Sequence, residues 1–436
     1  MTRHYRTAVV ETTEEPIVCA VAVADIFDNY VVYESPEGWQ VACGTAAEVV
    51  VGPRTVRCVY DGQTVETPWE GDPLVPVRRF LNELPLAGWR AYGWCAFELG
   101  AALAGLEPAD EVLAHLLVPA VEVRLQGSHA TVRSLTAEDL DTVERRLADP
   151  TSQPRRPGGR ASVDLAAATD EYQEAVASVV RDINAGKLEK AVLSRVVGVP
   201  EKIDFPASFM AGRRRNTPAR SFLLAMSGLQ VFGFSPEIVL RVDADGTLVS
   251  QPLAGTRALS GDAETDVRLR RQLLTDAKEI HEHAISVRTA VEELHGSCRP
   301  DTVAVSEFMT VKERGSVQHL GSQVTGRLAE GRDAWSALAA VFPAVTASGV
   351  PKRAAYEAIG RLESQRRGPY AGAVVTVDAD GSMDAALVLR SAYSRDGVTW
   401  LRAGAGVVGQ SRPERELEET CEKLGCIAGY LVISEG

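Results

Sequence analysis

The sequence predicts a mixed α/β protein, of the α+β kind in which strands and helices are both abundant. Two observations lead to this prediction. Short runs rich in β-branched and aromatic residues end at Asp-Gly turns, as at residues 55–62 and 392–403. Other segments carry apolar residues at helical spacing, most clearly residues 169–186.

Composition excludes several classes of protein. The 436 residues carry a net charge of −13, which argues against non-specific binding to nucleic acid or to an anionic membrane surface. The seven cysteines form no CxxC pair, and no apolar leader or membrane-length apolar run occurs. We therefore expect a reduced, cytoplasmic protein with no nucleic-acid and no membrane partner.

The first part of the chain, to about residue 148, is predicted to contain mostly short strands, such as residues 31–34 and 55–60. The run 116–118 fits either a buried strand or the end of a helix. The Pro- and Arg-rich segment 149–160 is the clearest linker-like stretch, and it either divides two domains or forms a long surface loop.

The middle of the chain begins with the amphipathic helix 169–186, which Thr169 can cap and Gly186 can end. A strand is predicted over residues 191–197, with Lys190 at its mouth. Further strands are expected at residues 221–226, 230–237, 238–242 and 248–253.

A long helix is predicted from about residue 264 to 294, and strands at 385–392 and 398–403 follow. The last helix is expected to start at Ser411. Pro413 suits its first turn, and Glu414 can complete a capping box with the serine.

Two acidic pairs share one geometry. Glu279 and Glu282 are spaced i, i+3, as are Glu416 and Glu419, so each pair lies on one face of its helix. Such like charges need compensation, and Mg²⁺ is typically held by one or two carboxylates, with substrate oxygens and water completing its shell. The alternative is that both pairs are solvated helix faces.

Other motifs are less specific. The run 281–283 reads His-Glu-His but is not HExxH, which disfavours zinc. Residues 404–409 match GxGxxG, yet too little chain follows for a dinucleotide-binding domain. Their glycines still allow close approach to a ligand. Lys190 as a base and Glu237 as an acid in an aromatic setting are further candidates.

Together these segments resemble the chorismate-utilising enzymes, a family that includes anthranilate, aminodeoxychorismate, isochorismate and salicylate synthases. The resemblance covers roughly residues 170 to 432 and is closest to salicylate synthases of the mycobactin-siderophore type, where it extends to residues 92–98. The motifs that carry it lie at residues 190–195, 234–237, 252–257, 278–283, 316–320, 342–349, 404–406 and 414–416.

The resemblance implies a single large domain over residues 1–436, with a layered, mostly antiparallel β core, helices outside, and the fold of anthranilate synthase component I. The motif-bearing, chorismate-binding region would span about 168–432, and residues 1–160 would complete the β core. The segment 149–160 would then be a loop rather than a boundary.

The resemblance also implies a site. Glu282 and Glu416 match Mg²⁺ ligands, with Glu279 and Glu419 close by or acting through water. Lys190 matches the base that activates water and Glu237 the acid that assists the leaving hydroxyl. Other positions match the substrate cleft, with Tyr370 and Arg390 gripping the enolpyruvyl carboxylate; the full set is Gly255, Thr256, His319, Thr346, Tyr370, Leu389, Arg390, Gly404, Gly406 and Lys423.

The implied activity is Mg²⁺-dependent conversion of chorismate to isochorismate and then to salicylate and pyruvate. An isochorismate synthase that stops after the first step is the alternative, and an inactive chorismate-binding protein is a remote one. Ala254 stands where aminodeoxychorismate synthases often carry a nucleophilic lysine, and anthranilate synthases lack the base. We therefore expect water as nucleophile, chorismate as the small-molecule partner, no glutaminase subunit, and a monomer.

Overall fold

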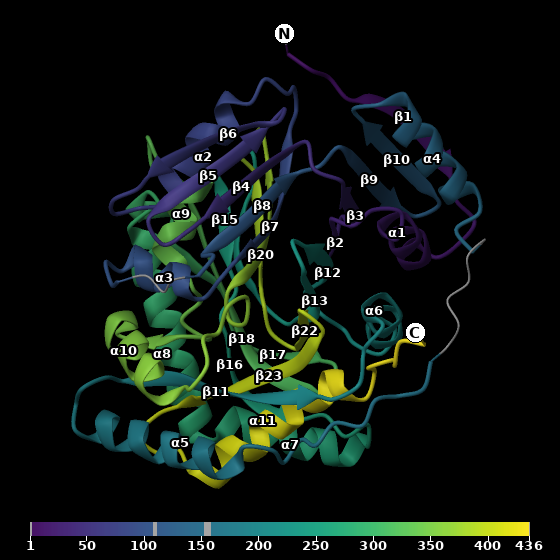
Figure 1. Ribbon diagram of the computed structural model, residues 1–436. Coiled ribbons are helices and arrows are strands. Elements are labelled where there is room, and N and C mark those ends of the chain that lie inside the picture. Colours follow the sequence, from purple (N-terminus) through teal and green to yellow (C-terminus); the bar gives the residue numbers. More distant parts are fainter. Residues whose placement is uncertain (1, 108–110, 152–157, 436) are drawn as a thin grey trace.

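Two large antiparallel sheets form the interior of the protein in the computed structural model, which describes residues 2–107, 111–151 and 158–435 (Figure 1). The first sheet has eleven strands within these residues, in the spatial order β1 (Arg6–Glu11), β10 (His129–Ser134), β9 (Val121–Gln126), β3 (Gly38–Cys43), β2 (Tyr30–Ser35), β12 (Arg220–Met226), β13 (Leu229–Ser235), β22 (Ser391–Arg395), β23 (Val398–Val407), β11 (Lys190–Val199) and β19 (Gly349–Val350).

The second sheet has twelve strands in the described part of the chain. Eleven follow the order β16 (Leu253–Ala258), β18 (Val317–Arg327), β15 (Thr247–Ser250), β14 (Ile238–Val242), β21 (Met383–Leu387), β20 (Ala373–Asp378), β7 (Arg90–Cys95), β8 (Ala114–Val118), β4 (Ala47–Val51), β5 (Thr55–Tyr60) and β6 (Gln63–Pro68). The twelfth, β17 (Ala304–Arg314), pairs with β18 beside this path.

Helices cover the outsides of the two sheets (Figure 1). Those against the eleven-stranded sheet are α1 (Pro16–Ala24), α4 (Ala137–Ala148), α6 (Phe205–Arg213), α5 (Thr169–Asn184), α11 (Pro413–Ala428) and α10 (Lys352–Leu362), which packs on β11 and β19. Those on the side of the twelve-stranded sheet are α2 (Leu74–Glu83), α3 (Glu98–Leu103), α7 (Ala263–Thr275), α8 (Ala277–His295) and α9 (Ala334–Val341), with the short 3₁₀ helix η1 (Pro300–Thr302). The predicted fold class, a mixed α/β protein with a mostly antiparallel core, is confirmed.

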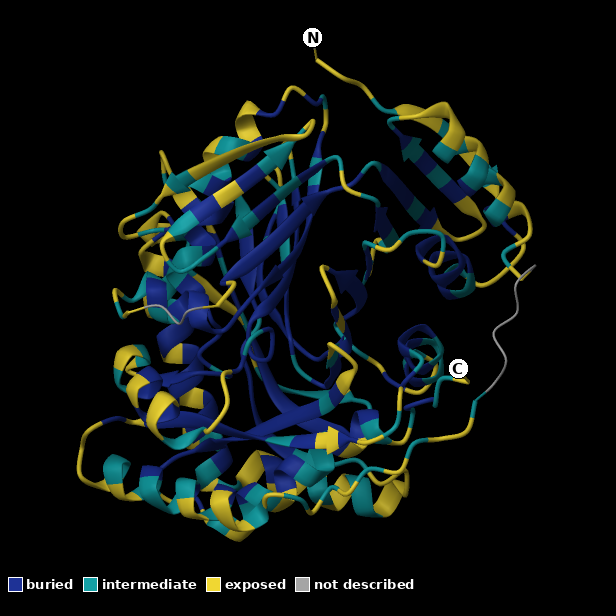
Figure 2. Ribbon diagram, viewed as in Figure 1, coloured by how far each residue is buried: buried dark blue, intermediate teal, exposed yellow. Residues whose placement is uncertain are grey.

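The eleven-stranded sheet is buried on both faces, and the pattern of β2 explains why. Val31 and Tyr33 point into the cluster shared with the other sheet, while Tyr30 and Val32 point into the cluster under α1, α4 and α6. Because successive side chains of a strand point to opposite faces, a run of apolar residues fills two cores at once. Figure 2 shows most of the central strands as buried, while β6 and the outer helix faces are exposed.

Two of the places where the chain passes from one sheet to the other lie next to each other, and these two crossings position the site. The first crossing joins β13 to β14 through Pro236 and Glu237, and the second joins β21 to β22 through the segment that contains Leu389 and Arg390. The backbone N–H of Phe234 donates to the carbonyl of Arg390, at 3.1 Å, so the two crossings are held together.

The long helix predicted over residues 264–294 is two helices, which corrects the prediction. Asp276 has an extended backbone between α7 and α8, and its side chain accepts hydrogen bonds from the N–H groups of Lys278 and Glu279. An aspartate that satisfies the free N–H groups of a new helix favours a fresh start over continuation. This break places Glu279 in the first turn of α8.

Two predicted helix caps are wrong. Thr169 is already inside α5, whose N-cap position is Ala168. Ser411 does not cap α11, because its hydroxyl accepts from the N–H of Val408 at 3.1 Å; the N-cap position is Arg412 and has no side-chain hydrogen bond. Pro413 does stand at the start of the helix, as predicted. Residues 116–118, whose sequence fits either a buried strand or the end of a helix, form part of strand β8.

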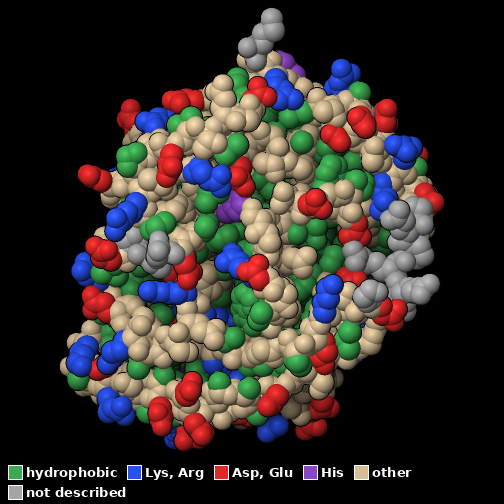
Figure 3. Space-filling model, in the orientation of Figure 1, with side chains coloured by type: hydrophobic (Ala, Val, Ile, Leu, Met, Phe, Trp, Pro, Cys, Tyr) green, Lys and Arg blue, Asp and Glu red, His purple; other side chains and the backbone are tan. Residues whose placement is uncertain are grey.

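Residues 152–157 of the linker-like segment lie outside the described residues. Each sheet combines strands from before and after this segment, which supports a single domain. Within the described ranges, no helix is both long and apolar enough to cross a bilayer. On the face drawn in Figure 3, described Lys and Arg side chains lie among Asp and Glu rather than in one basic patch.

Candidate active site

A cleft of about 750 Å³, part of it open to solvent, lies where the two sheet crossings meet α8 and α11. Most of the residues that the sequence predicts for the site line this cleft. They are Glu237, Gly255, Thr256, Glu282, His319, Thr346, Tyr370, Leu389, Arg390, Gly404, Gly406, Glu419 and Lys423. The other three do not line it: Lys190 contacts the lining residue Glu282, Glu279 accepts from the N–H of the lining residue Thr256, and Glu416 contacts Lys278.

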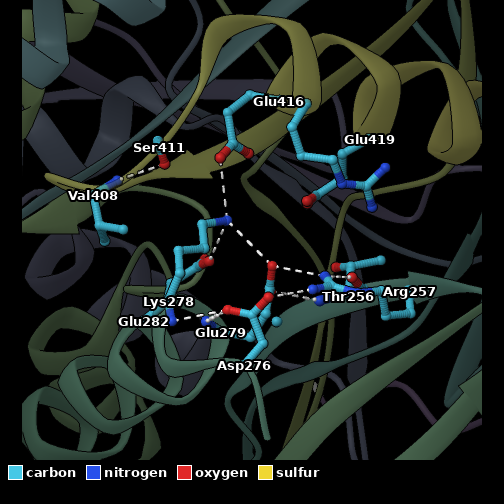
Figure 4. Close-up of polar contacts among 12 residues, drawn as sticks. Thr256, Arg257, Asp276, Lys278, Glu279, Glu282, Val408, Ser411, Glu416 and Glu419 are labelled. Carbon is cyan, nitrogen blue, oxygen red and sulfur yellow. Dashed lines mark hydrogen bonds and ion pairs between the residues drawn. The ribbon is translucent and has the colours of Figure 1, made fainter. Parts of the chain in front are cut away.

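The two acidic pairs face each other across the gap between α8 and α11, and all four carboxylates are buried (Figure 4). Burial raises the pKa of Glu279 and raises that of Glu416 to about 7. Burial also acts against ionisation of Glu419, but the ammonium groups of Lys423 and Lys278 hold its pKa at about 2. The solvated-face alternative is therefore wrong for both pairs.

Lys278 lies among these carboxylates. Its Nζ is 3.2 Å from Oε1 of Glu416, 3.4 Å from Oε2 of Glu282 and 3.5 Å from Oε1 of Glu279 (Figure 4). Burial disfavours its charge, but the surrounding carboxylates raise the pKa of Lys278 well above its ordinary value. One ammonium group is thus shared by three glutamates.

The donor chemistry of the cluster fits a hard divalent cation. Carboxylate oxygens are what Mg²⁺ prefers, and Oε2 of Glu416 is buried without a hydrogen-bond partner among the described residues. As arranged around Lys278, no three His, Cys, Asp or Glu side chains of the described ranges converge as ligands of one metal ion. The four glutamates therefore suit Mg²⁺ chemically, but the ammonium group of Lys278 lies among their carboxylates.

Lys190 opens β11 and is fully buried. Its Nζ is 3.1 Å from Oε1 of Glu282 and donates to the hydroxyl of Ser286 at 3.0 Å. Both partners belong to α8, one turn apart, so the helix fixes the lysine against the sheet. The amine of Lys190 therefore lies next to the carboxylate of Glu282, which lines the cleft.

Glu237 is buried at the first sheet crossing, between β13 and β14. Burial raises its pKa to about 8, although the hydroxyl of Thr346 and the N–H of Leu253 donate to its two oxygens. A carboxyl group with this pKa carries its proton at neutral pH and can act as a general acid.

Arg390 provides a buried guanidinium at the second crossing. It donates to the carbonyl of Arg314, at 3.0 Å, and to Nε2 of His319. Because arginine can only donate, His319 accepts at Nε2 and carries its proton on Nδ1, which faces Thr256 and the carbonyl of Gly255. Burial and Arg390 lower the pKa of His319 well below its ordinary value, so the ring is neutral.

The glycines of β23 make room for neighbouring side chains. A Cβ at Gly406 would lie 2.0 Å from Oε1 of Glu282, and one at Gly404 would lie 2.9 Å from the hydroxyl of Tyr370. The carbonyl of Gly404 also accepts from Lys423, which pairs with Glu419 at 2.7 Å. Residues 404–407 of the GxGxxG run thus lie in β23, which packs against the site and pairs antiparallel with β11, unlike the parallel strands of a dinucleotide-binding unit.

Sequence reasoning gave no role to several residues that hold the site together. Lys278 precedes the first acidic pair, and Ser286 lies four residues after Glu282. Arg257 ends the motif at residues 252–257 and pairs with Glu279 at 2.8 Å. For Lys278 and Ser286, the signal in the sequence is their spacing of four residues from Glu282, which places them on the same helix face. His283, in contrast, contacts Ser322 and the carbonyl of Ala254 with its two ring nitrogens, so it is structural.

Comparisons with known proteins agree with this site. A profile described as chorismate binding enzyme matches residues 28–429. A salicylate synthase of Mycolicibacterium paratuberculosis is 44% identical over 410 residues, which are 93% of this chain and 90% of that protein.

Two solved structures share the fold. The menaquinone-specific isochorismate synthase of Escherichia coli has a TM-score of 0.74 at 23% identity, covering 98% of this chain and 95% of that one. Anthranilate synthase component I of Streptococcus pneumoniae has a TM-score of 0.72 at 24% identity, covering 89% and 91%. With the family profile matched over nearly its whole length, the chain belongs to the chorismate binding enzymes.

Proposed function

We propose that this protein is a Mg²⁺-dependent salicylate synthase, which converts chorismate to isochorismate and then to salicylate and pyruvate. The observation that carries the proposal is one cleft served by a buried amine, Lys190, and a protonated carboxyl group, Glu237. The choice of salicylate is supported by the salicylate synthase that is 44% identical over 93% of the chain.

In the first step, Lys190 takes a proton from water as its oxygen bonds to C2 of chorismate. Both ring double bonds shift, from C1=C2 and C5=C6 to C1=C6 and C4=C5, as the C4–O bond breaks, and Glu237 gives its proton to the departing hydroxyl, which leaves as water. The amine must be free of its proton when the step begins. One water molecule enters and one leaves, so the product is isochorismate.

In the second step, the hydrogen on C2 of isochorismate moves to the methylene carbon of the enolpyruvyl group while the C3–O bond breaks. The ring becomes aromatic, and salicylate and pyruvate result. No proton has to pass through the protein, so the main task of the cleft is to hold a reactive conformer.

Chorismate is a dianion, and the cleft offers separate cationic groups to its two carboxylates. Arg390 has N–H groups beyond those that contact Arg314 and His319, and Tyr370 lies on the same wall. These two residues would hold the enolpyruvyl carboxylate. Bound Mg²⁺, held by Glu282 and Glu416 with Glu279 and Glu419 in support, would supply positive charge for the ring carboxylate.

An isochorismate synthase that stops after the first step is the second candidate. The same residues would serve both activities, and the overall fold is shared with a protein of that activity. An inactive chorismate-binding protein is disfavoured, because the proposed base and acid are both present and buried at the cleft.

The decisive experiment is product analysis after incubation with chorismate and Mg²⁺, and again with EDTA. Salicylate and pyruvate in equal amounts, with no turnover in EDTA, are expected. Isochorismate without pyruvate would favour the second candidate. No turnover with Mg²⁺ present would favour the binding protein, and full turnover in EDTA would remove the metal from the proposal.

We further propose a single domain over residues 1–436, a cytoplasmic monomer, and no glutaminase subunit. Free thiols at all seven cysteines support a reducing, cytoplasmic location. Water as the nucleophile makes a glutaminase subunit unnecessary. Gel filtration of the purified protein, and turnover without an ammonia source or second subunit, would test them.

A further inference from the structure

Lys278 differs from the other lysines of the site in the way it contacts its partners. Lys423 makes a short contact of 2.7 Å with one carboxylate, whereas Lys278 is 3.2–3.5 Å from three carboxylates at once. These three carboxylates come from two helices, so the ammonium group lies at the centre of the cluster (Figure 4). A central position among carboxylates is that of a bound cation.

The described side chains already compensate most of the charge of the cluster. Its four carboxylates are contacted by four cationic groups, Lys190, Lys278, Lys423 and Arg257, of which Arg257 is shared with Asp276 at 2.6 Å. A divalent ion added to this set would leave excess positive charge in a buried site, which is costly. An ammonium group and a Mg²⁺ ion that would contact the same carboxylate oxygens therefore exclude each other.

Lys278 is the group that has to leave. Lys190 has no solvent exposure and is bonded to Ser286, and Lys423 is bonded to Glu419 and to the carbonyl of Gly404. The side chains of Lys423 and Lys278 are 22% and 14% exposed, so both reach the solvent boundary, but Lys278 is held among the described residues only by ion-pair contacts of 3.2–3.5 Å. The unpartnered Oε2 of Glu416 marks the coordination that the lysine leaves unfilled.

We propose that Lys278 is an internal counter-cation that occupies the metal position in the metal-free enzyme and is displaced when Mg²⁺ binds. It keeps the four glutamates folded together without a metal and lowers their affinity for Mg²⁺. Both effects rest on the Mg²⁺ site of the proposed function.

Calorimetric titration with Mg²⁺, without substrate, tests this in the full-length protein and in Lys278→Met. Removing the competing charge should tighten Mg²⁺ binding by roughly tenfold or more. The variant should melt at a lower temperature than the wild type in EDTA and regain the difference in Mg²⁺. Unchanged or weaker Mg²⁺ binding by a folded Lys278→Met would overturn the proposal.

Lys352→Met is the matched control. Lys352 is also a half-buried lysine, with its side chain 18% exposed, and it pairs with a glutamate of α8, Glu293 at 2.8 Å, but it lies outside the acidic cluster. Its loss should lower the melting temperature equally with and without Mg²⁺ and leave Mg²⁺ affinity unchanged.

A measurement on the wild type covers the case in which Lys278→Met does not fold. Displacement exposes the amine, so Mg²⁺ should increase acetylation of Lys278 by acetic anhydride, read by mass spectrometry against the exposed Lys187. Equal or reduced labelling in Mg²⁺ would mean that the lysine stays in place. Absence of any Mg²⁺ binding by the wild type would remove the metal site itself, whereas binding without increased labelling would remove only the role of Lys278.

Discussion

The amine of Lys190 lies 3.1 Å from the carboxylate of Glu282, so the proposed base and a proposed metal ligand are in direct contact. The two residues are far apart in the chain, and β11 and α8 bring them together. Both are buried, so water does not screen the pair. A change at either residue is therefore expected to disturb both the base and the metal site.

Lys190→Gln should separate the two halves of the reaction. Loss of the amine removes the group that takes a proton from water, so conversion of chorismate should fall by roughly 10²–10⁴-fold. Pyruvate release from supplied isochorismate should remain measurable, because that step needs no base. Chromatographic rates with each substrate give the comparison, and equal loss of both activities would contradict the assignment of Lys190 as the base.

The pKa of Glu237, about 8, sets an alkaline limit on activity. The acid is functional only while protonated, so conversion of chorismate should decline as the pH rises through about 8. Rates of isochorismate breakdown should not follow that decline. Glu237→Gln, which cannot deliver a proton, should remove the first step at every pH; a variant with wild-type rates would exclude the residue as the acid.

The same group should make stability depend on pH. Its pKa is about 8 in the folded protein and 4.5 as its ordinary value, so between these limits the folded state holds one more proton. The wild type should therefore lose stability relative to Glu237→Gln as the pH rises from 4.5 to 8, by on the order of 4 kcal/mol. Denaturant unfolding of both proteins at pH 5 and 8.5 measures this difference, and parallel curves would contradict it.

The acidic pairs could be found from the sequence because each is local. Spacing of i, i+3 places Glu279 beside Glu282 once a helix forms, and the break at Asp276 shifts the start of the helix without changing that face. The role of Lys278 could not be found in this way. It depends on how closely α11 approaches α8, and packing sets that distance between residues 278 and 416, which are 138 positions apart in the chain.

The second crossing shows the same limit. The sequence predicts one strand over residues 385–392 with Arg390 inside it, which is wrong, because the chain leaves β21 after Leu387 and enters β22 at Ser391. His319, which contacts Arg390, comes from β18. The helix caps failed for a related reason, since Ser411 is used by Val408 in a loop whose geometry no spacing rule describes.

Arg390→Lys should weaken substrate binding more than it slows the chemistry. Lysine keeps the charge but loses the planar fork that can hold a carboxylate with two hydrogen bonds. The KM for chorismate should rise about 10–100-fold with a smaller change in kcat. Arg402→Lys is a control, because Arg402 lines the cleft but is engaged by Ser194, Glu363 and the carbonyl of Arg366.

The Arg402 change should lower the melting temperature and leave KM nearly unaltered. Equal KM effects from the two variants would indicate that Arg390 acts only through packing.

Gly406→Ala should impair the site without unfolding the protein. The added methyl group would lie 2.0 Å from Oε1 of Glu282, the oxygen that pairs with Lys190, so the carboxylate has to move. A displacement of about 1 Å in a reacting group can cost about 100-fold in rate, and a loss of that size is expected together with weaker Mg²⁺ binding.

Gly198→Ala is the matched control, since Gly198 lies on the paired strand β11 with no atom within 4 Å of an added Cβ. Activity, Mg²⁺ affinity and melting temperature of Gly198→Ala should all stay near the wild-type values. Full activity in Gly406→Ala would mean that the position of Glu282 does not matter for catalysis, and the contact between the base and the metal ligand would then have no functional consequence.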